Sequence, residues 1–562
     1  MNNRVLAAVV AALLVPAAAP VAADGITLDP SQQKRIDAVF QDYDKPDSPG
    51  CALGVMSGGR IVYAKGYGQA TLDPAVPIDS TKLFDIASVS KQFTAGAIVL
   101  LAQQSKIRLT DDVHKYIPEL PDYGVPITIN NLLWHTSGLR DYSILLLLGS
   151  FDYPEITTEA QALEFVKRQR KLDFAPGTKY SYSNTGYFLM SLIVKRVSGL
   201  SLNDFSRKYI FNPLAMPTAV FRDRHDLPIP NVALGYAPDE VGFVQSMSNW
   251  EQVGDGSLHL SIEELQKWDE NFFHPDVGGP QFVEEMLRRG TLNNGRRLTY
   301  ARGLQVDRYR GLERVKHGGD WVGYHANIER FPSVHTTVAL ECNLDPIPQY
   351  ELTEQVIDIV LEKVFPEPKP QEPPPQPSLP PERFIGEYFS KDWQAVFTVT
   401  QGEEGLLFNL LSFSLPLEAL GPTTFGVPGF PTIRIEFAVR GSAPAHSVTL
   451  KIDKDDTDTT HPVGQRFTPV PPADPAAYVG KFYSPELNVT WSVVRDAEGN
   501  LSVDDNDPTP ALEIKGPLLP AQQTDALYGL AGWLRFTRNT SGAVTGFDLS
   551  YSGVKDFRFN RQ

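Results

Sequence analysis

The alternation of apolar and polar residues predicts a mixed domain in the first two thirds of the chain. Residues 51–67 hold two apolar runs around a glycine-rich turn, which is typical of a β-hairpin. Residues 91–104 are apolar almost all round the helix that they would form, which indicates a buried helix. Further strand-like runs occur at residues 314–317, 326–331 and 337–343, and an amphipathic helix is expected at 353–365. Because strands lie at both ends with helices between them, we expect an α/β (α+β) domain with one antiparallel sheet beside a helical region.

A proline-rich segment at residues 366–381 separates this domain from the rest of the chain. Proline fixes φ and lacks an N–H group, so the segment is expected to be a stiff linker. Beyond it, residues 384–390 align with residues 478–484, and the agreement continues at the same offset of 94. Each copy alternates apolar and polar residues in short runs between turns, which predicts two small antiparallel β-barrels.

The predicted domain boundaries follow from these features and from the N-terminus. Residues 1–23 are typical of a secretory signal peptide, because Arg4 precedes an apolar run that ends in small residues. The other units are expected at residues 24–365 for the mixed domain, 366–381 for the linker, and 382–470 and 474–562 for the two barrels. The two barrel copies close on similar dipeptides, Arg466-Phe467 and Arg558-Phe559.

Composition and charge limit the partners of the chain. With 42% hydrophobic and 21% charged residues, it has the composition of a well-packed globular protein. Its net charge of −16 disfavours nucleic acid and anionic membrane surfaces as partners. The N-terminal apolar run is shorter than the about 20 residues that span a bilayer, and no later stretch is apolar enough. We therefore expect an exported protein, periplasmic or secreted, with no stable membrane span.

The two cysteines, Cys51 and Cys342, leave two interpretations open. An exported protein can keep a disulfide, so the two residues can be bonded to each other. Two buried free thiols explain the sequence equally well. Their spacing matches no metal site, and neither a metal nor an organic cofactor is expected.

The quartet Ser88-Val89-Ser90-Lys91 stands at the start of the predicted buried helix. Residues at i and i+3 share a helix face, so the Lys91 amine is expected close to the Ser88 hydroxyl. A serine hydroxyl needs a base to act as a nucleophile, and a buried lysine with a lowered pKa can serve as that base. The structural alternative is an N-cap serine followed by a surface lysine.

Two further segments carry candidate chemistry. Tyr182-Ser183-Asn184 lies in a loop rich in proline, glycine and serine, from which a tyrosine can reach into a cleft. Near two cations its phenol could ionise and exchange a proton with Ser88 or with the leaving group. His317-Gly318-Gly319 ends a strand-like run, where glycine lets a ligand approach the backbone. A buried tyrosine with a satisfied hydroxyl and a plain turn are the alternatives for these two segments.

Together, the three segments resemble the serine β-lactamase and penicillin-binding-protein superfamily, specifically its class C-like branch with D-aminopeptidases, carboxypeptidases and esterases. The family order is Ser-x-x-Lys, then Tyr-x-Asn, then Lys-Thr-Gly or His-x-Gly. The family-like context extends over Phe84–Thr94, Leu132–Leu139 and Tyr182–Tyr187. The resemblance covers about residues 38–365, and D-aminopeptidases also carry two β-barrel domains after the catalytic one.

The resemblance implies three catalytic side chains. Ser88 is the nucleophile that becomes acylated, and Lys91 and Tyr182 share the proton transfers. The mechanism that it implies needs no metal or organic cofactor. His135, in a loop typical of the family, is expected to be structural.

The resemblance also implies the groups that bind substrate. Asn184 orients Lys91 and the substrate amide, and His317 and Gly319 lie beside the substrate. The backbone N–H of Asp320 completes the oxyanion hole with that of Ser88. Many relatives carry a lysine in place of His317, and neutral histidine is a poorer partner for a substrate carboxylate.

These features predict a serine hydrolase that cleaves amide bonds of small peptides through an acyl-enzyme at Ser88. Its substrates are expected to be D-amino-acid or cell-wall-type peptides, amides or esters. An esterase and a class C-like β-lactamase are the enzyme alternatives. A penicillin-binding protein without turnover, or a cell-wall-binding module, is the alternative from another class. The sequence leaves the role of the two barrels open.

Overall fold

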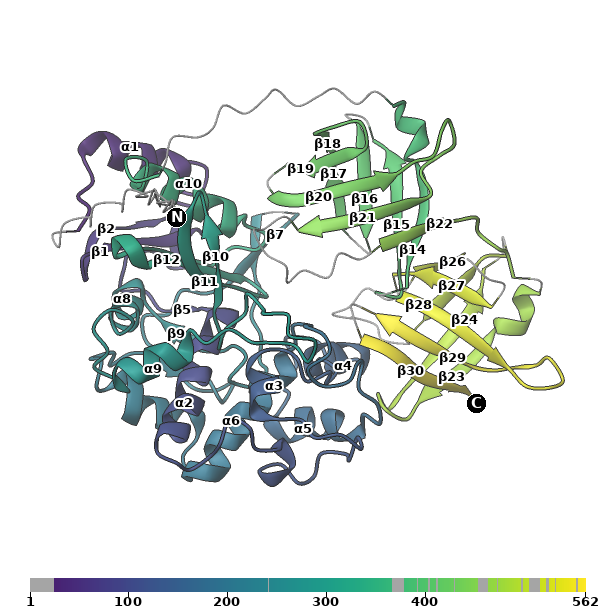
Figure 1. The fold of residues 1–562 in the computed structure, drawn as a ribbon, viewed down its shortest axis with the longest axis horizontal. Helices are drawn as coiled ribbons and strands as arrows, with labels where there is room; N and C mark the ends of the chain where they lie inside the picture. The colour runs from purple at the N-terminus through teal and green to yellow at the C-terminus, as the bar shows by residue number, and fades with distance from the viewer. Residues whose placement is uncertain are drawn as a thin grey trace, which may run out of the picture.

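The computed structural model consists of a large α/β body and two β modules (Figure 1). It describes residues 25–240, 242–365, 379–391, 393–402, 405–410, 413–428, 430–452, 463–472, 474–496, 499–504, 516–521, 525–530, 532–551 and 554–562. The predicted signal peptide, residues 1–23, and most of the predicted linker, residues 366–381, lie outside the described residues.

An antiparallel sheet of six described strands forms the centre of the large body, in the order β10-β11-β12-β13-β1-β2. The strands are β1 (Cys51–Ser57), β2 (Arg60–Tyr67), β10 (Gln305–Tyr309), β11 (Leu312–Trp321), β12 (Tyr324–Phe331) and β13 (Thr336–Cys342). The predicted hairpin and the sheet built from both ends of the domain are confirmed. The strand predicted at 314–317 is longer than expected, because β12 pairs with β11 as far as Trp321.

Neighbouring residues of β1 enter two different cores, as the alternation of side chains in a strand requires. Leu53 packs with Val356 on one face, and Ala52 joins the core that contains Ile262 on the other. The helices of these faces are α1 (Pro30–Val39) and α10 (Gln349–Val360) on the first and α8 (Ile262–Glu270) on the second. The helix predicted at 353–365 corresponds to α10, which begins and ends earlier than expected.

Cys51 and Cys342 face each other across β1 and β13 and form a disulfide. The bond joins residues that are 291 positions apart in the chain. Of the two interpretations that the sequence left open, the bonded form is the one present. The disulfide ties the first strand of the sheet to the last.

The helical region is built around α2 (Lys91–Gln103), which is buried from Lys91 to Leu101 and confirms the predicted helix. It follows directly on the 3₁₀ turn η1 (Ala87–Ser90) and packs against α6 (Asn184–Ser198). The other helical elements of the body are η2 (Val113–Lys115), α3 (Ile129–Leu133), α4 (Tyr142–Leu148), α5 (Glu159–Arg168), α7 (Leu202–Ser206), η3 (Arg207–Phe211), α9 (Gly279–Met286) and η4 (Pro332–Val334). Its short strands are β3 (Gln69–Leu72), β4 (Ala75–Pro77), β5 (Phe84–Asp85), β6 (Val220–Phe221), β7 (Tyr236–Asp239), β8 (Gly242–Gln245) and β9 (Leu258–Leu260).

The first β module is a sheet of nine described strands in the order β17-β16-β15-β14-β22-β21-β20-β19-β18. Its elements are η5 (Pro381–Arg383), β14 (Gly386–Ser390), β15 (Ala395–Gln401), β16 (Leu406–Leu410), β17 (Phe413–Pro416), β18 (Glu418–Ala419), β19 (Thr424–Val427), β20 (Phe430–Ala438), β21 (Ser447–Ile452) and β22 (Val463–Phe467).

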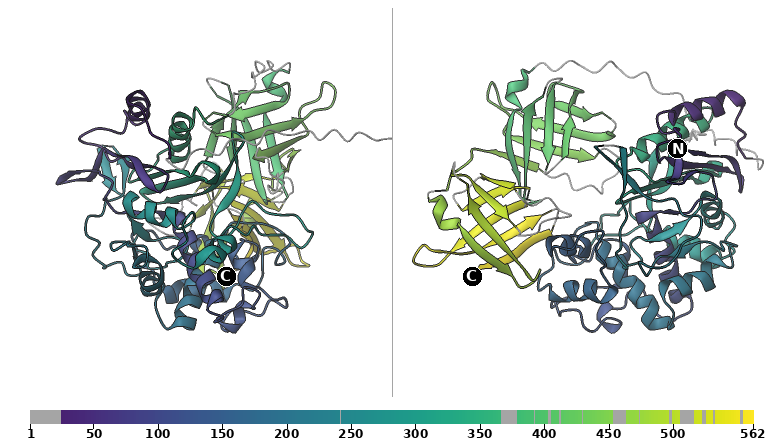
Figure 2. Two further views of the ribbon diagram at one scale, coloured as in Figure 1. Left: turned by 60° about the vertical axis from the view of Figure 1, so that its left-hand side comes forward. Right: turned by 180° about the vertical axis from the view of Figure 1, so that it is seen from behind.

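The second module is a closed barrel that runs from β23 to β30 (Figure 2). Its elements are η6 (Pro475–Tyr478), β23 (Gly480–Ser484), β24 (Val489–Arg495), β25 (Leu501–Asp504), β26 (Gly516–Pro520), β27 (Ala526–Gly529), β28 (Gly532–Arg538), β29 (Val544–Tyr551) and β30 (Val554–Arg561). The β fold expected for both copies is confirmed.

The structural repeat shows which arginines correspond. β14 and β15 match β23 and β24 at the predicted offset of 94, but the similar dipeptides that contain Arg466 and Arg558 do not occupy equivalent positions. Arg466 stands opposite Tyr388 in the sheet, and Arg561 stands opposite the equivalent residue, Phe482. Each of these two arginines also donates to main-chain carbonyl oxygens just before the first strand of its module. The counterpart of Arg466 is therefore Arg561, and the similar dipeptide is a coincidence of the sequence.

Among the residues described, none of the helices is both long enough and apolar enough to cross a bilayer.

Removing the disulfide is expected to lower stability. In the variant Cys51→Ala/Cys342→Ala, we expect the free energy of unfolding to fall by about 2–5 kcal/mol, because the unfolded chain regains conformational freedom. Thermal unfolding with and without a reductant measures this. The wild type should melt at a lower temperature in reductant, and the double variant should not respond to it. Thiol titration shows whether the reductant has broken the bond. If the bond is broken and the wild type still melts at the same temperature, the expectation is contradicted.

Candidate active site

Ser88 is held in a tight turn between β5 and α2. The preceding residue, Ala87, has a φ of 46°, in the left-handed region that residues other than glycine seldom adopt. The Asp85 carboxylate accepts a hydrogen bond from the Ala87 N–H at 2.8 Å, and Ile86 donates to the Leu258 carbonyl at 3.0 Å. These bonds stabilise an unfavourable backbone conformation directly before the predicted nucleophile.

Lys91 lies one helical turn after Ser88, with its amine completely buried. Its Nζ atom is 2.9 Å from Ser88 Oγ, 2.8 Å from Asn184 Oδ1 and 2.7 Å from the Asp255 carbonyl oxygen. As an ammonium group, Nζ donates to all three oxygens. As a neutral amine, it donates to Asn184 and Asp255 and accepts the Ser88 proton. Both protonation states are therefore fully hydrogen-bonded in one geometry.

The charged form of Lys91 is destabilised by burial and stabilised by two nearby carboxylates. Burial lowers the pKa of Lys91, and the negative charges of Asp255 and Asp141 partly oppose this. Burial likewise raises the pKa of Asp255, whose carboxylate accepts a hydrogen bond from Tyr142 at 3.0 Å. Lys91 thus gives up its proton more readily than an exposed lysine does.

Tyr182 approaches Ser88 from the loop that precedes α6. Its hydroxyl lies near Ser88, and its ring centre lies 4.8 Å from Lys91 Nζ. The residue as a whole is 40% exposed, but burial of the hydroxyl end raises the pKa of Tyr182 well above its ordinary value. The loop rests on His135, whose Nδ1 accepts from the Ser183 N–H at 3.1 Å. This contact fits the structural role predicted for His135.

His317 points its ring at Tyr300, not at a charged partner. Its Nδ1 lies 2.6 Å from the Gly318 carbonyl, so Nδ1 carries the proton, and Nε2 accepts from the Tyr300 hydroxyl at 2.9 Å. Burial, together with the nearby Lys91 charge, lowers the pKa of His317 to about 3. Tyr182 therefore does not lie between two cations that would ionise it, because His317 is neutral and the pKa of Tyr182 is raised well above its ordinary value.

Gly319 lets β11 approach the turn that holds Ser88. A Cβ atom at this position would lie 2.4 Å from the Ile86 carbonyl oxygen and 3.0 Å from the Ser88 nitrogen. The strand β10 pairs with β11 only up to Lys316, so the edge of β11 beyond it faces η1. A side chain at residue 319 would push these two segments apart.

Asp320 adds a negative charge beside the third motif. Its carboxylate accepts hydrogen bonds from Tyr350 at 2.9 Å and from Gln349, and it pairs with His325 at 2.8 Å. Burial acts to raise the pKa of Asp320, but these partners hold it below its ordinary value. Although burial acts against it, the carboxylates of Asp320 and Asp345 raise the pKa of His325 to about 9.

The structure brings all the residues predicted for the site to one place: Ser88, Lys91, Tyr182, Asn184, His317, Gly319 and Asp320. Sequence reasoning missed three residues of the site. Asp255 contacts Lys91, Tyr142 contacts Asp255, and Tyr300 contacts His317. The Gly254-Asp255-Gly256 segment carried a faint signal, a carboxylate between glycines. Nothing in the sequence pattern marks Tyr142 or Tyr300.

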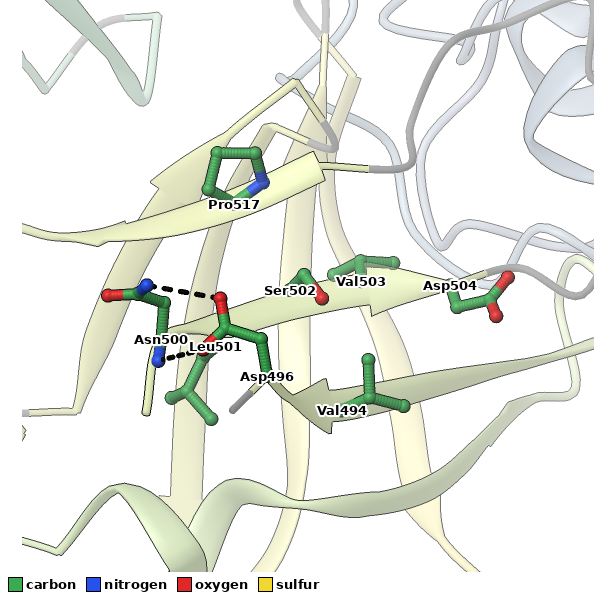
Figure 3. Close-up of a pocket in the computed structure, with 8 residues that line it drawn as sticks. All are labelled: Val494, Asp496, Asn500, Leu501, Ser502, Val503, Asp504 and Pro517. Atoms are coloured by element: carbon green, nitrogen blue, oxygen red, sulfur yellow. Dashed lines mark hydrogen bonds between the residues drawn. The ribbon is translucent and has the colours of Figure 1, made fainter. Parts of the chain in front are cut away.

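A hollow of about 450 Å³ on the second barrel is not the catalytic centre (Figure 3). It is lined by Val494, Asp496, Asn500, Leu501, Ser502, Val503, Asp504 and Pro517. Asn500 bonds to the Asp496 carboxylate through both its main-chain and side-chain nitrogens, at 2.7 and 3.0 Å. These eight residues include no lysine, histidine or tyrosine that could activate Ser502.

Comparison with known families agrees with the geometry around Ser88. Residues 36–361 match the family described as Beta-lactamase. The chain belongs to this family. It is a serine hydrolase of the β-lactamase and penicillin-binding-protein superfamily, and its α/β body is the β-lactamase-like domain.

Curated relatives within the superfamily match to different extents. Penicillin-binding protein 4* of Bacillus subtilis (strain 168) is 26% identical over 446 residues, which cover 75% of this chain and 97% of that protein. D-aminopeptidase of Gluconobacter oxydans (strain 621H) is 28% identical over 297 residues, 52% of this chain and 56% of that protein. The chain thus spans little more than half the length of the D-aminopeptidase.

Solved structures share the fold. The octameric penicillin-binding protein homologue from Pyrococcus abyssi has a TM-score of 0.54 at 22% identity, over 77% of this chain and 99% of its own. The D-amino acid amidase from Ochrobactrum anthropi SV3 complexed with D-phenylalanine has a TM-score of 0.50 at 22% identity, over 59% and 99%.

Replacing Asp255 should change the pH at which the site works. In Asp255→Asn the amide no longer stabilises the Lys91 ammonium, so the pKa of Lys91 falls further. We expect the acid limb of the rate–pH profile for Ser88 modification to move to lower pH by about one unit, equivalent to about 1.4 kcal/mol of lost attraction. Asp122→Asn, at an exposed aspartate, is the control and should leave the profile unchanged. A shift to higher pH in Asp255→Asn would contradict the electrostatic role.

Proposed function

We propose that the protein hydrolyses amide bonds of small substrates through an acyl-enzyme at Ser88. The observation that carries the proposal is the buried Lys91 amine, hydrogen-bonded to Ser88 Oγ at 2.9 Å. Because its three partners satisfy both the amine and the ammonium, a proton can pass from Ser88 to Lys91 without any rearrangement of the site. A lowered pKa makes Lys91 available as the base.

In the acylation step, Ser88 Oγ attacks the substrate carbonyl carbon and its proton moves to Lys91 Nζ. The C–N bond then breaks, and the leaving amine takes a proton from Lys91 through the Tyr182 hydroxyl. The raised pKa of Tyr182 keeps the phenol protonated, so it relays a proton and does not act as the primary base. Water then attacks the ester with Lys91 again as the base, which releases the acid and restores Ser88.

The developing oxyanion needs two N–H donors, for which we propose the main chain of Ser88 and of Asp320. The close contact of Gly319 with the Ser88 turn supports this, because it brings the open edge of β11 beside the nucleophile. Each such donor typically lowers the barrier by about 3–4 kcal/mol. Asn184 and Gly319 would line the substrate cleft between these groups.

The charges around the third motif favour substrates without a carboxylate at this point. A neutral His317 offers no cation, and the positive charge of His325 is already paired with the Asp320 and Asp345 carboxylates. Tyr350 also packs over Gly318, where a Cβ atom would lie 2.2 Å from its ring. We therefore propose small D-amino-acid amides or peptides as substrates, in line with the D-aminopeptidase and amidase relatives. Cell-wall peptides outside the cytoplasm are a natural source for an exported enzyme.

A side-by-side comparison of three substrates tests this function. Hydrolysis of D-alanine p-nitroanilide, a p-nitrophenyl ester and nitrocefin is measured for the wild type and for Ser88→Ala. We expect the anilide and the ester to be cleaved and nitrocefin to be the poorest substrate. Ser88→Ala should lose at least about a thousandfold of each activity, since it removes the nucleophile.

The other outcomes distinguish the alternatives. Nitrocefin turnover above that of the anilide would indicate a β-lactamase. A stable adduct on Ser88 without turnover would indicate a penicillin-binding protein. The match to Penicillin-binding protein 4*, which covers 97% of that protein, supports this alternative. Activity that survives in Ser88→Ala would overturn the proposal.

A further inference from the structure

Arg140 joins the catalytic domain to the second barrel at a buried contact. Its guanidinium pairs with Asp173 of the same domain and with Glu486 of the barrel. It also donates to the Lys555 carbonyl at the start of β30, and its central carbon lies 4.4 Å from the Phe557 ring centre. The Arg140 side chain is 1% exposed and each carboxylate is 12% exposed, so the contact excludes most solvent.

Further bonds lock the same contact. The Gln169 side chain accepts from Arg140 at 2.9 Å and donates to the Glu486 carbonyl at 3.5 Å. The Lys555 N–H donates to the Asp173 carboxylate at 3.1 Å. Figure 1 shows the barrel end with β30 beside α4, which begins two residues after Arg140. Since these groups satisfy one another away from water, the barrel cannot shift without leaving charges unpaired.

The main chain of Arg140 supports the second catalytic motif. Its carbonyl oxygen accepts from the Thr185 hydroxyl at 2.7 Å, and the oxygen of that hydroxyl accepts from the Tyr142 N–H at 2.7 Å. The next residue, Asp141, accepts a hydrogen bond from the Asn184 N–H through its carboxylate. The segment that carries Arg140 therefore positions the first residues of α6.

Asn184 passes this positioning on to the base. Its Oδ1 atom accepts from Lys91 Nζ at 2.8 Å. We propose that Arg140, held by Glu486, is a positioning residue for Lys91, and that the second barrel is thereby part of the catalytic apparatus. This inference rests on the proposed role of Lys91 as the base for Ser88.

A loosened contact is expected to slow the chemistry before it unfolds the protein. Proton transfer needs Lys91 within hydrogen-bond reach of Ser88, and displacements of about 1 Å in such groups cost rate strongly. The groups that the Arg140 side chain contacts include none of the predicted substrate-binding residues, so binding of substrate should change less than the chemical step. The signature is therefore a lower kcat with a nearly constant KM.

Glu486→Gln tests the inference, because it keeps the side-chain shape and removes the barrel's charge from the two carboxylates that face Arg140. We expect the rate constant for labelling of Ser88 by a fluorophosphonate to fall about tenfold, with KM for the anilide changed less than about twofold. The acid limb of the labelling rate against pH should also move, since Lys91 loses its fixed partner Asn184. Intact-mass spectrometry gives the labelling rate, and steady-state kinetics give kcat and KM.

Asp525→Asn is the matched control. It removes a carboxylate that pairs with Arg538 at 2.9 Å inside the same barrel, with no contact to Arg140. The control variant should label Ser88 at the wild-type rate. Thr185→Val, alone and combined with Glu486→Gln, tests whether the effect of Glu486 reaches Lys91 through Thr185. If it does, the loss of labelling rate in the double variant should be smaller than the product of the two single losses.

The outcomes separate this inference from the proposed function. A wild type that is not labelled at Ser88 would overturn the proposed function itself. Equal labelling rates for wild type, Glu486→Gln and Asp525→Asn would overturn only the positioning role of Arg140. So would a lower melting temperature in Glu486→Gln with an unchanged labelling rate, or losses that multiply in the double variant.

Discussion

The buried amine of Lys91 is the constraint on which the rest of the site depends. It lies among Ser88 Oγ, Asn184 Oδ1 and the Asp255 carbonyl, and these three oxygens come from separate parts of the chain. Burying a cation is costly unless every N–H finds an acceptor. The fold must therefore hold α2, α6 and the loop before β9 in register, and that same arrangement sets the proton affinity of the amine.

Much of this arrangement could be predicted from the sequence, because it is carried by local patterns. The spacing of Ser88 and Lys91 on one helix places them together, and the apolar run behind them predicts the buried helix. The hairpin and the strands at the end of the domain were equally visible as apolar runs. Motif order then indicated that Tyr182 and His317 belong to the same site.

What the sequence could not give are contacts made by tertiary packing. Asp255 reaches Lys91 from 164 residues away, and Tyr300 contacts His317 through a single hydrogen bond. The local pattern of apolar and polar residues does not indicate which distant residues come into contact. The pairing of Arg561 with Phe482 was hidden for the same reason, since strand register and not the similar dipeptide decides it. Arg140 gave no signal either, because its partners are distant in the chain and one of the two carboxylates, that of Glu486, lies in another domain.

The pH dependence of Ser88 modification in the wild type tests the central claim most directly. The second-order rate constant for labelling by a fluorophosphonate is measured by intact-mass spectrometry across the range from acid to alkaline pH, with peptide mapping of the adduct. With a desolvated Lys91 as the base, the rate should rise about tenfold per pH unit and reach a plateau below the ordinary lysine range near 10.5. A rate that does not change with pH, a rise that continues past that range, or an adduct on a residue other than Ser88 would contradict the account.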